Sequence, residues 1–411
     1  MRSATARSAT SFDEVRSLQL EKLRAGLGEV LAANPFWRAR LHDVRGWDDF
    51  ERLPLTTKTE LTADQAAHPP FGSNLTYPLE RYVRLHQTSG SSGDRPLRWL
   101  DTAESWEWWL SIWSDHVYPA AGVTAADRLF FAFSFGPFIG FWSAFGGAQR
   151  IGALCLSGGA MTSEQRIGSM VDLGATVLLS TPTYALRLAD VADQIGVSLS
   201  AARIRTTIHA GEPGASIPAT RATIEAAYSA TAFDHTGMTE LGPTGFSCSA
   251  RDGVHLVESE FIFEVAADGE LVATNLGRWG TPLIRYRTGD RVEVSREPCS
   301  CGSPFLKIVG GIRGRVDDMF TVRGVNLFPS QVEDIVRRHP EISEFAIERR
   351  SERQMDEVAL LVETSVDSFS SERLEADLRQ ALGVRLGCRV VPAGTLPRSE
   401  LKSRRVLRAP D

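Results

Sequence analysis

Cysteine is scarce in this chain, with five cysteines among 411 residues. A disulfide framework needs more, so the class of small disulfide-stabilised secreted domains is excluded. Because five is an odd number, at least one thiol stays unpaired, which favours a reducing compartment. We therefore expect a cytoplasmic protein.

An excess of charge of one sign is also lacking. Lys and Arg number 45 against 51 Asp and Glu, which gives a formal net charge of -6. No basic stretch of the kind that neutralises nucleic-acid phosphates stands in the chain. We expect no nucleic-acid partner, and the sequence shows no internal repeat and no low-complexity tract.

Long apolar runs are rare, and the longest uncharged run, residues 129–149, is rich in phenylalanine. A membrane-spanning helix of this length is the alternative interpretation. Five glycine and proline residues would break such a helix, namely Gly136, Pro137, Gly140, Gly146 and Gly147. A buried strand, a glycine turn and a packed helix accommodate them, so we expect no membrane span. Residues 1–11 lack the apolar run of a secretory signal.

From residue 129 to 240, short apolar runs alternate with amphipathic stretches. This alternation is typical of a parallel, doubly wound sheet with helices between the strands. The expected strands are 129–135, 151–156, 176–180, 206–210 and 231–234, and the expected helices include 163–171 and 184–194.

Beyond Glu240 the pattern changes twice. Shorter, turn-separated strands such as 254–257, 261–265, 270–274 and 292–294 first indicate an antiparallel sub-barrel. After Asp318, the order strand, helix, two strands, helix and strand predicts a small α+β unit. The predicted fold class is therefore α/β, with a large N-terminal domain of residues 1–316 and a small C-terminal domain of residues 317–411.

A loop of glycines and hydroxyl groups consists of Thr88, Ser89, Gly90, Ser91, Ser92 and Gly93. Such a loop can wrap a triphosphate with N–H and hydroxyl donors, because glycine lets the backbone approach closely. It does not match G-x-x-x-x-G-K-[ST], which disfavours a Walker-type NTPase. Taken alone, a loop of this composition is more often a plain turn.

Three further segments favour a nucleotide site. The run from Asp234 to Glu240 ends in a hydroxyl beside a carboxylate, a pair suited to a phosphate and its Mg²⁺. Asp290 stands on a tight turn and can accept both ribose hydroxyls. Arg315 stands where the large domain gives way to the small one. Four such segments in this order are hard to obtain by accident.

With these motifs in order, the sequence from Leu53 to its end resembles the adenylate-forming superfamily of acyl-CoA synthetases, and most closely its phenylacetate-CoA ligase-like branch. The resemblance implies that the 88–93 loop holds the β- and γ-phosphates of ATP, Thr239 the α-phosphate and Glu240 the Mg²⁺. It also implies that Asp290 holds the ribose. The other nucleotide-binding residues that it implies are Gly211, Glu212, Pro213, Asp234, His235, Thr236 and Arg315.

The C-terminal segment from Gly394 to Lys402 resembles the family's last motif, whose lysine touches the carboxylate and the α-phosphate. Lys402 is therefore expected to be catalytic with Thr239 and Glu240, because a cation there neutralises developing charge. Without the resemblance, Lys402 is a solvated residue of a basic tail. The resemblance further implies that Asp317 is the hinge of a mobile small domain, and that Gly324 faces the thiol tunnel.

Several positions depart from the family pattern. Thr236 stands where the family usually has an aromatic residue, and Gly214 where it has a tryptophan. These two changes put nucleotide stacking and the acyl pocket in doubt. Asp94 and Arg95 extend the phosphate loop, and Arg98 stands near the place of a frequent lysine. None of these changes removes a catalytic group.

Three cysteines and one histidine form a candidate zinc site: Cys248, His255, Cys299 and Cys301. Three thiolates and an imidazole satisfy tetrahedral Zn²⁺, and a closed set of four protein ligands is structural rather than catalytic. Several members of the branch carry such a site. The alternative is unliganded thiols, because Cys-x-Cys is tighter than the usual spacing and the two halves lie far apart.

The acid pocket is expected between the phenylalanine-rich segment and the 234–240 segment. Its expected residues are Phe135, Phe138, Gly140, Phe141, His209, Gly211 and His235. Aromatic and small side chains predict a flat slot for an aromatic acid such as benzoate, hydroxybenzoate, anthranilate or phenylacetate. The two histidines could bind a ring hydroxyl or amine. The alternative is that most of these phenylalanines belong to the core.

Two half-reactions are implied by the resemblance. A carboxylate and MgATP give acyl-AMP and pyrophosphate, and a nucleophile then takes the acyl group after the small domain rotates. Coenzyme A is the expected acceptor, and a carrier-protein thiol, a hydroxyl or an amine is the alternative. A phosphotransferase would leave Asp290 and Lys402 unexplained, and an inactive nucleotide-binding protein should have lost them. Relatives suggest a homodimer.

Overall fold

The computed structural model describes residues 11–88, 96–322, 325–352, 355–364, 366, 369–398 and 405–408. The chain divides into two compact units, one of Met1–Ala160, His235–Thr288 and Glu293–Val309, the other of Met161–Asp234, Gly289–Val292 and Gly310–Asp411. Two of the points at which the chain crosses from one unit to the other lie within a strand, namely after Asp234 and after Thr288. These units do not test the predicted domain boundary at residue 316, which stays a prediction.

Helices dominate the N-terminal part of the first unit, and polar caps start the longer ones. Ser11 accepts from the backbone N–H of Glu14 at 3.3 Å, and Thr57 and Glu60 form a capping box. The helices of this unit are α1 (Phe12–Ala33), α2 (Pro35–Arg38), α3 (Trp47–Glu51), α4 (Lys58–Ala67), η1 (Leu79–Arg81), α5 (Ala103–Ile112), the π-helix η2 (Trp113–Val117), α6 (Tyr118–Ala120) and α7 (Trp142–Arg150).

The strands of the first unit are mostly antiparallel. β1 (Tyr82–Gln87) pairs with β2 (Arg98–Thr102), and β10 (Phe261–Val265) pairs with β11 (Glu270–Asn275). A second run of neighbours consists of the end of β7 (Thr231–Met238), β8 (Gly242–Phe246), β9 (Gly253–Leu256), β14 (Lys307–Val309) and β13 (Val294–Ser295). β3 (Arg128–Phe131) and β4 (Leu154–Ser157) pair in parallel.

The uncharged run from residue 129 to 149 forms a strand, a loop and a helix, as predicted. The expected strand was too long, because β3 ends at Phe131 and the loop with Gly136 and Pro137 follows. None of the described helices has both the length and the apolar character that crossing a membrane requires.

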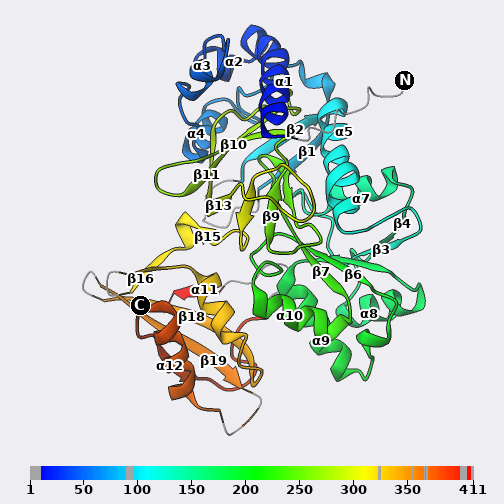
Figure 1. Cartoon of the computed structure of the whole chain (residues 1–411), viewed down its shortest axis with the longest axis vertical. Helices are drawn as coiled ribbons and strands as arrows, with labels where there is room; N and C mark the ends of the chain where they lie inside the picture. Colours follow the sequence, from blue (N-terminus) through cyan, green and yellow to red (C-terminus); the bar gives the residue numbers. More distant parts are fainter. Residues whose placement is uncertain are drawn as a thin grey trace. The chain divides into compact units, whose positions relative to one another are not determined.

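The second unit contains a parallel sheet with its helices beside it (Figure 1). β5 (Val177–Ser180) pairs with β6 (Thr206–His209), and β6 pairs with the start of β7. Thr162 and Gln165 form the capping box of α8, and Thr181 caps α9 just before Pro182. The helices are α8 (Ser163–Asp172), α9 (Pro182–Gln194), η3 (Leu199–Ala201) and α10 (Pro218–Tyr228).

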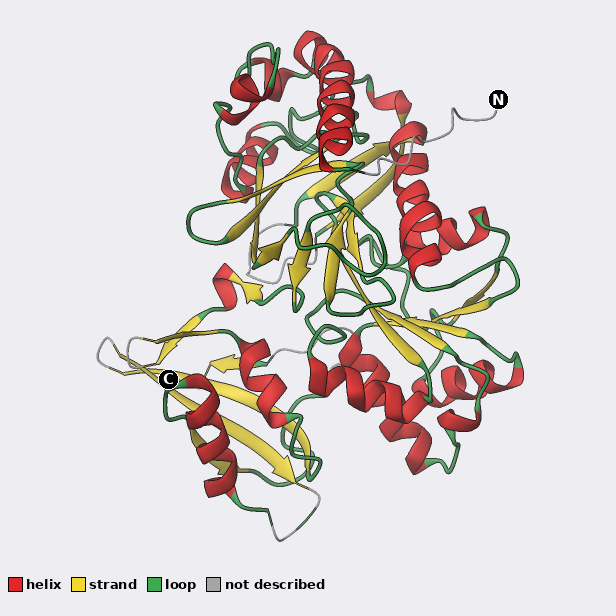
Figure 2. Ribbon diagram, in the orientation of Figure 1, coloured by secondary structure: helices red, strands yellow, loops and turns green. Residues whose placement is uncertain are grey.

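The C-terminal part of the second unit is a four-stranded sheet of order β20-β19-β18-β21 with helices on one face (Figure 2). Apolar side chains of both helices and of the central strands form its core, among them Val332, Phe345, Val362 and Leu374. The elements are β15 (Gly314–Arg315), η4 (Val316–Asp318), β16 (Phe320–Val322), β17 (Val325–Leu327), α11 (Pro329–Val336), β18 (Ile342–Glu352), β19 (Met355–Thr364), α12 (Ser371–Leu382), β20 (Gly387–Val390) and β21 (Val406–Arg408).

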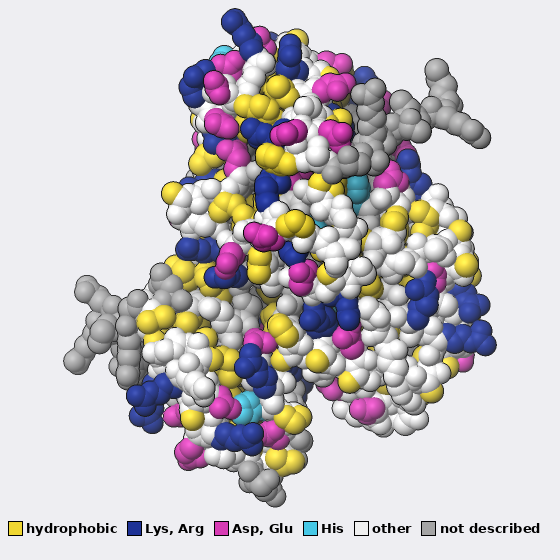
Figure 3. Space-filling model, in the orientation of Figure 1, with side chains coloured by type: hydrophobic (Ala, Val, Ile, Leu, Met, Phe, Trp, Pro, Cys, Tyr) yellow, Lys and Arg dark blue, Asp and Glu magenta, His cyan; other side chains and the backbone are white. Residues whose placement is uncertain are grey.

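The fold class is confirmed as α/β with parallel and antiparallel sheets and a small α+β part. Three further predicted bounds need correction. β4 begins at Leu154 rather than at residue 151. β12 (Tyr286–Arg291) covers the residues before the expected strand 292–294, and β7 runs on past Asp234 to Met238. On the face that Figure 3 draws, acidic and basic side chains are interspersed over the described residues, in line with the small net charge.

Two glycines of α1 give a matched test of packing. A Cβ on Gly26 would lie 1.9 Å from Cε2 of Trp279, whereas a Cβ on Gly28 would meet nothing within 4 Å. We expect Gly26→Ala to lower the free energy of unfolding by about 1–3 kcal/mol, because it overpacks the contact. Gly28→Ala should raise it by about 0.5–1 kcal/mol, because alanine favours helix. Denaturant unfolding measures both, and equal effects would contradict the packing described.

Candidate functional site

The turn after β7 carries the predicted phosphate and magnesium residues. Thr239 and Glu240 stand in a turn between β7 and β8. The residues from His235 to Met238 were expected to follow a strand, but they continue it, because β8 supplies antiparallel partners such as Phe246 opposite His235. A register shift lies between Thr236 and Gly237, and irregularities of this kind re-aim side chains beside active sites.

A buried ion pair holds this turn. Arg278 donates from Nε and Nη2 to the two carboxylate oxygens of Asp101 at 2.7 and 2.9 Å. Its Nη1 donates to the backbone carbonyl oxygens of Thr239 and Glu240 at 2.9 and 2.8 Å. Both charged side chains have an exposed fraction of 0%. The sequence analysis missed Arg278 and Asp101.

The base of the predicted phosphate loop is closed by Thr88. Its backbone N–H donates to the carbonyl oxygen of Leu97 at 3.0 Å, and its hydroxyl accepts from the N–H of Leu97 at 3.0 Å. Thr88 follows β1, and Leu97 precedes β2, so the predicted loop connects two paired strands. The loop residues Ser89, Gly90, Ser91, Ser92 and Gly93 lie outside the described residues, as do Asp94 and Arg95.

Two predicted nucleotide residues make local contacts in the second unit. The Glu212 carboxylate accepts from the backbone N–H of Thr183 at 3.0 Å, at the start of α9. Gly211 precedes it with a φ of 98°, and Pro213 follows it half-buried. The Asp234 carboxylate accepts a short hydrogen bond from the Ser216 hydroxyl. These carboxylates are thereby fixed at the ends of β6 and of the parallel part of β7.

The structure gives a physical reason for one departure from the family pattern, Gly214, and a local contact for another, Thr236. A Cβ on Gly214 would lie 2.2 Å from Cβ of Pro182, so the second unit leaves no room there for a larger side chain. The Thr236 hydroxyl is buried and lies 3.1 Å from the Thr244 hydroxyl.

Asp290 and Arg315 lie opposite one another on β12 and β15. The Arg315 guanidinium donates to Asp290 Oδ1 at 3.3 Å, and Asp290 is 7% exposed. Two predicted ribose and nucleotide residues are thus brought together in the second unit. Asp317 follows in the short helix η4, while Gly324 and Lys402 lie outside the described residues.

The predicted acyl-pocket phenylalanines gather around a residue that the sequence analysis missed. The ring of Phe133 lies 5.7, 5.5 and 5.2 Å from the rings of Phe135, Phe138 and Phe141, each time edge to face. Gly140 is required here, because its φ is 41° and a Cβ would lie 1.8 Å from Cζ of Phe133. This cluster belongs to the first unit.

Trp113 joins His235 to this aromatic cluster. Its ring centroid lies 4.2 Å from that of His235 and 6.4 Å from that of Phe141. Trp113 begins the π-helix η2, a rare local geometry that recurs at functional sites. Burial lowers the pKa of His235 from 6.5 to about 3, so the ring is neutral at physiological pH. In the sequence, the only signal that could have pointed to Trp113 was the group of tryptophans just before it.

His209 belongs to the second unit. Its Nδ1 lies 3.3 Å from the Ser180 hydroxyl and its Nε2 lies 2.8 Å from the Thr207 hydroxyl. Burial lowers its pKa to about 4, so this ring is also neutral. With both nitrogens engaged, its contact with a substrate stays a prediction.

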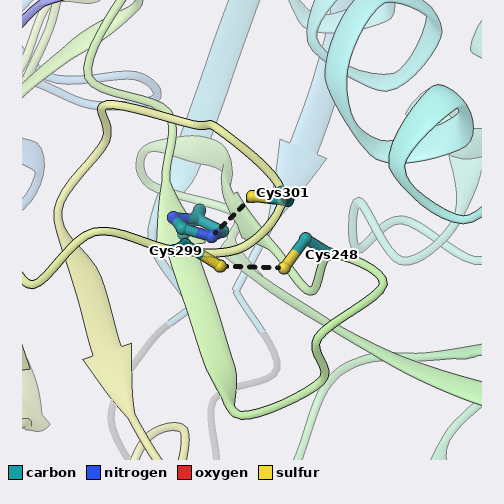
Figure 4. Close-up of side chains that lie close together, drawn as sticks. Cys248, Cys299 and Cys301 are labelled. Carbon is teal, nitrogen blue, oxygen red and sulfur yellow. Dashed lines mark hydrogen bonds between the residues drawn. The ribbon is translucent and has the colours of Figure 1, made fainter.

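The four predicted metal ligands come together in the first unit (Figure 4). Their ligand atoms all lie within 4.8 Å of one another, with 3.6 Å between the sulfurs of Cys248 and Cys299. The Cys301 sulfur lies 3.4 Å from Nε2 of His255, and Nδ1 of His255 lies 3.3 Å from the carbonyl oxygen of Phe305. Metal-bound histidines are commonly oriented by such a carbonyl contact.

Cys155 and Cys388 take no part in this cluster. Both are half-buried, and burial raises the pKa of each thiol to about 11. Cys388 packs against the apolar core of the C-terminal part as a partly buried residue.

Comparisons with known proteins find relatives along the whole chain. A family model described as the AMP-binding enzyme C-terminal domain matches residues 324–409. A phenylacetate-coenzyme A ligase of Thermus thermophilus is 30% identical, and the match covers 96% of each sequence. A solved structure of 2-hydroxyisobutyryl-CoA ligase in the postadenylation state is 26% identical, with a TM-score of 0.92 over 100% of this chain and 94% of that one.

A more distant solved structure shares the fold. The anthranilate CoA ligase AuaEII, in complex with anthranoyl-AMP, has a TM-score of 0.61 and 17% identity, over 78% of this chain and 65% of that one.

Proposed function

Because this chain belongs to the phenylacetate-coenzyme A ligase family of adenylate-forming enzymes, we propose that it joins a small aromatic carboxylic acid to coenzyme A through an acyl-adenylate. Membership of this family makes the chain an ATP-dependent acid–thiol ligase that forms AMP. The observation that carries the aromatic acid is the cluster of Phe133, Phe135, Phe138 and Phe141, which Trp113 joins to a buried, neutral His235.

In the first half-reaction, a carboxylate oxygen attacks the α-phosphorus of ATP and pyrophosphate leaves. Thr239 holds the α-phosphate, and Asp290 accepts hydrogen bonds from the ribose. The ammonium of Lys402 neutralises the charge that develops between the carboxylate and the phosphoryl group. The ion pair of Asp290 with Arg315 supports this assignment, because it fixes the carboxylate on β12.

Glu240 is proposed to hold Mg²⁺. The residue is half-buried, and among the described residues no cationic side chain pairs with it. Hard divalent cations favour such an oxygen ligand on a fixed backbone, so the residue fits the ion. Bound Mg²⁺ would offset phosphate charge, as it does in phosphoryl transfer generally.

A short 2-hydroxy acid is the second candidate substrate. The 2-hydroxyisobutyryl-CoA ligase structure favours it, because it is 26% identical and has a TM-score of 0.92. A neutral imidazole such as His235 can bind the hydroxyl of either a hydroxy acid or a ring-substituted benzoate. The edge-to-face phenylalanine cluster is the feature that favours the aromatic acid.

The adenylation step predicts acid-dependent exchange of labelled pyrophosphate into ATP. We would assay benzoate, anthranilate, phenylacetate, 2-hydroxyisobutyrate and a fatty acid, and expect one of the aromatic acids to support the fastest exchange. Lys402→Ala should slow this exchange by about 100-fold or more, because it removes a cation that stabilises the transition state.

Arg404→Ala is the matched control for this test. It removes a neighbouring positive charge of the same basic tail, and it should change the exchange rate by less than about threefold. Equal losses in both variants would make Lys402 an ordinary member of the tail. ADP formation without exchange for any acid would instead indicate phosphoryl transfer.

The acyl acceptor is tested with the best acid and purified protein. Coenzyme A should convert the adenylate to a thioester and release AMP in equal amount. Exchange that persists while coenzyme A yields no thioester would favour the alternative acceptors, a carrier-protein thiol, a hydroxyl or an amine.

We also propose that a structural Zn²⁺ is bound by the Cys/His cluster. In a tetrahedral site, Zn–S of about 2.3 Å and Zn–N of about 2.0 Å put neighbouring ligand atoms about 3.5–3.8 Å apart. The 3.6 Å between Cys248 and Cys299 and the 3.4 Å between Cys301 and His255 fit this geometry. The four protein ligands close the coordination shell, so the ion would be structural.

Zinc content and thermal stability test this proposal together. The purified protein should carry about one zinc ion per chain, and Cys299→Ser should lose the zinc and lower the unfolding midpoint. Cys388→Ser, at a half-buried thiol outside the cluster, should keep the zinc. Elemental analysis measures the metal. The site would be refuted if the wild-type protein contained no zinc and a chelator did not change its unfolding midpoint.

A further inference from the structure

Burying the Arg278 and Asp101 pair is costly, and stability alone does not explain it. Moving two charges out of water costs several kcal/mol per ion, and apolar residues of similar size are often neutral or stabilising replacements. The guanidinium also lies 4.7 and 5.3 Å from the ring centroids of Trp109 and Trp99, so its surroundings are dry. A different benefit must therefore account for this charged pair.

The hydrogen bonds of Arg278 point to that benefit. Four of its five N–H groups are used, two on Asp101 and two on the consecutive carbonyl oxygens of Thr239 and Glu240. A rigid guanidinium that binds two successive carbonyls fixes the orientation of both peptide planes. The directions in which the side chains of Thr239 and Glu240 leave the backbone are fixed with them.

Asp101 connects the same pair to the strand before the phosphate loop. Its Oδ2 lies 3.5 Å from Nδ1 of His86, and His86 stands on β1 two residues before Thr88. Burial opposes ionisation of Asp101, but the charge of Arg278 and the contact with His86 outweigh it and lower its pKa. One ionised carboxylate therefore binds the arginine that holds the turn and lies beside a histidine of the strand that leads to the loop.

We propose that Arg278 is a positioning residue for the magnesium-dependent step, and that Asp101 sets the Thr239–Glu240 turn in register with the strand leading into Thr88. The inference rests on the function proposed for this turn. Neither side chain touches the reacting atoms. Their contribution is geometric, because carboxylate ligands and phosphate donors act only when held within a fraction of an ångström.

Arg278→Lys tests the inference, since it keeps the positive charge and loses the fork that spans both carbonyls. We expect the half-saturating Mg²⁺ concentration to rise about tenfold or more and the kcat of pyrophosphate exchange to fall similarly, as for other residues behind a metal ligand. The KM for the carboxylic acid should stay within about twofold. A merely structural role would not separate these parameters.

Arg285→Lys is a closely matched control. Arg285 also binds one carboxylate with two nitrogens, at 3.0 and 2.7 Å from the oxygens of Glu264, and it also donates to two carbonyl oxygens, those of Glu51 and Leu53. It does not contact the turn. This variant should lower the unfolding midpoint and leave the half-saturating Mg²⁺ concentration unchanged. Equal magnesium effects in both variants would overturn the inference.

A second variant covers the case in which Arg278→Lys does not fold. The double variant Asp101→Leu with Arg278→Met replaces the ion pair by apolar side chains, which buried pairs often tolerate. It should fold and show the same loss of magnesium affinity. A folded double variant with wild-type magnesium dependence would reject the inference, and a pair that tolerates neither replacement is structural, which rejects it as well.

Calorimetric binding of ATP at varied Mg²⁺ concentration separates this inference from the proposed function. Binding needs no acid, so the comparison of variants stands even if the acid panel fails. If the wild-type protein binds ATP in a magnesium-dependent way but shows no pyrophosphate exchange, this result would count against the proposed acids alone. Weakened binding in Arg278→Lys but not in Arg285→Lys would support the positioning role alone.

Discussion

The buried ion pair of Asp101 and Arg278 is the contact on which the candidate site of the first unit depends. It joins β2, the turn after β7 and the segment that contains Arg278, which are far apart in the sequence. Once both charges are out of water, any arrangement that separates them leaves an uncompensated charge at a cost of about 3–5 kcal/mol. The turn with Thr239 and Glu240 therefore has one strongly favoured geometry.

Elements that depend on local signals were predictable from the sequence. The helices α8 and α9 begin within two residues of their predicted starts, because Thr162 with Gln165 and Thr181 with Pro182 are strong start signals. The continuation of β7 was not predictable in this way. Residues beyond Asp234 become strand because β8 returns beside them, and a partner chosen by tertiary pairing leaves no local signal.

The site residues likewise divide into those that the sequence could predict and those that depend on tertiary contacts. Residue chemistry was enough to predict the Cys/His cluster. Cysteine is scarce in this chain, so few combinations of four metal ligands exist, and the fold brings this combination together. It was not enough to predict Arg278, because an arginine in a sequence is expected on the surface and its carboxylate partner stands 177 positions away. Phe133 and Trp113 were missed because many aromatic residues compete for the same role.

The two well-defined polar sites of the first unit lie near opposite ends of one short strand. β8 begins at Gly242, just after the turn that Arg278 holds, and ends at Phe246, two residues before Cys248. Phe246 also lies opposite His255 on β9 and packs against its ring. A strand of five residues is only about 17 Å long, so displacement at one end is carried to the other. With zinc bound as proposed, the Cys/His cluster would fix one end of β8, while the ion pair fixes the turn with Thr239 and Glu240 before its other end.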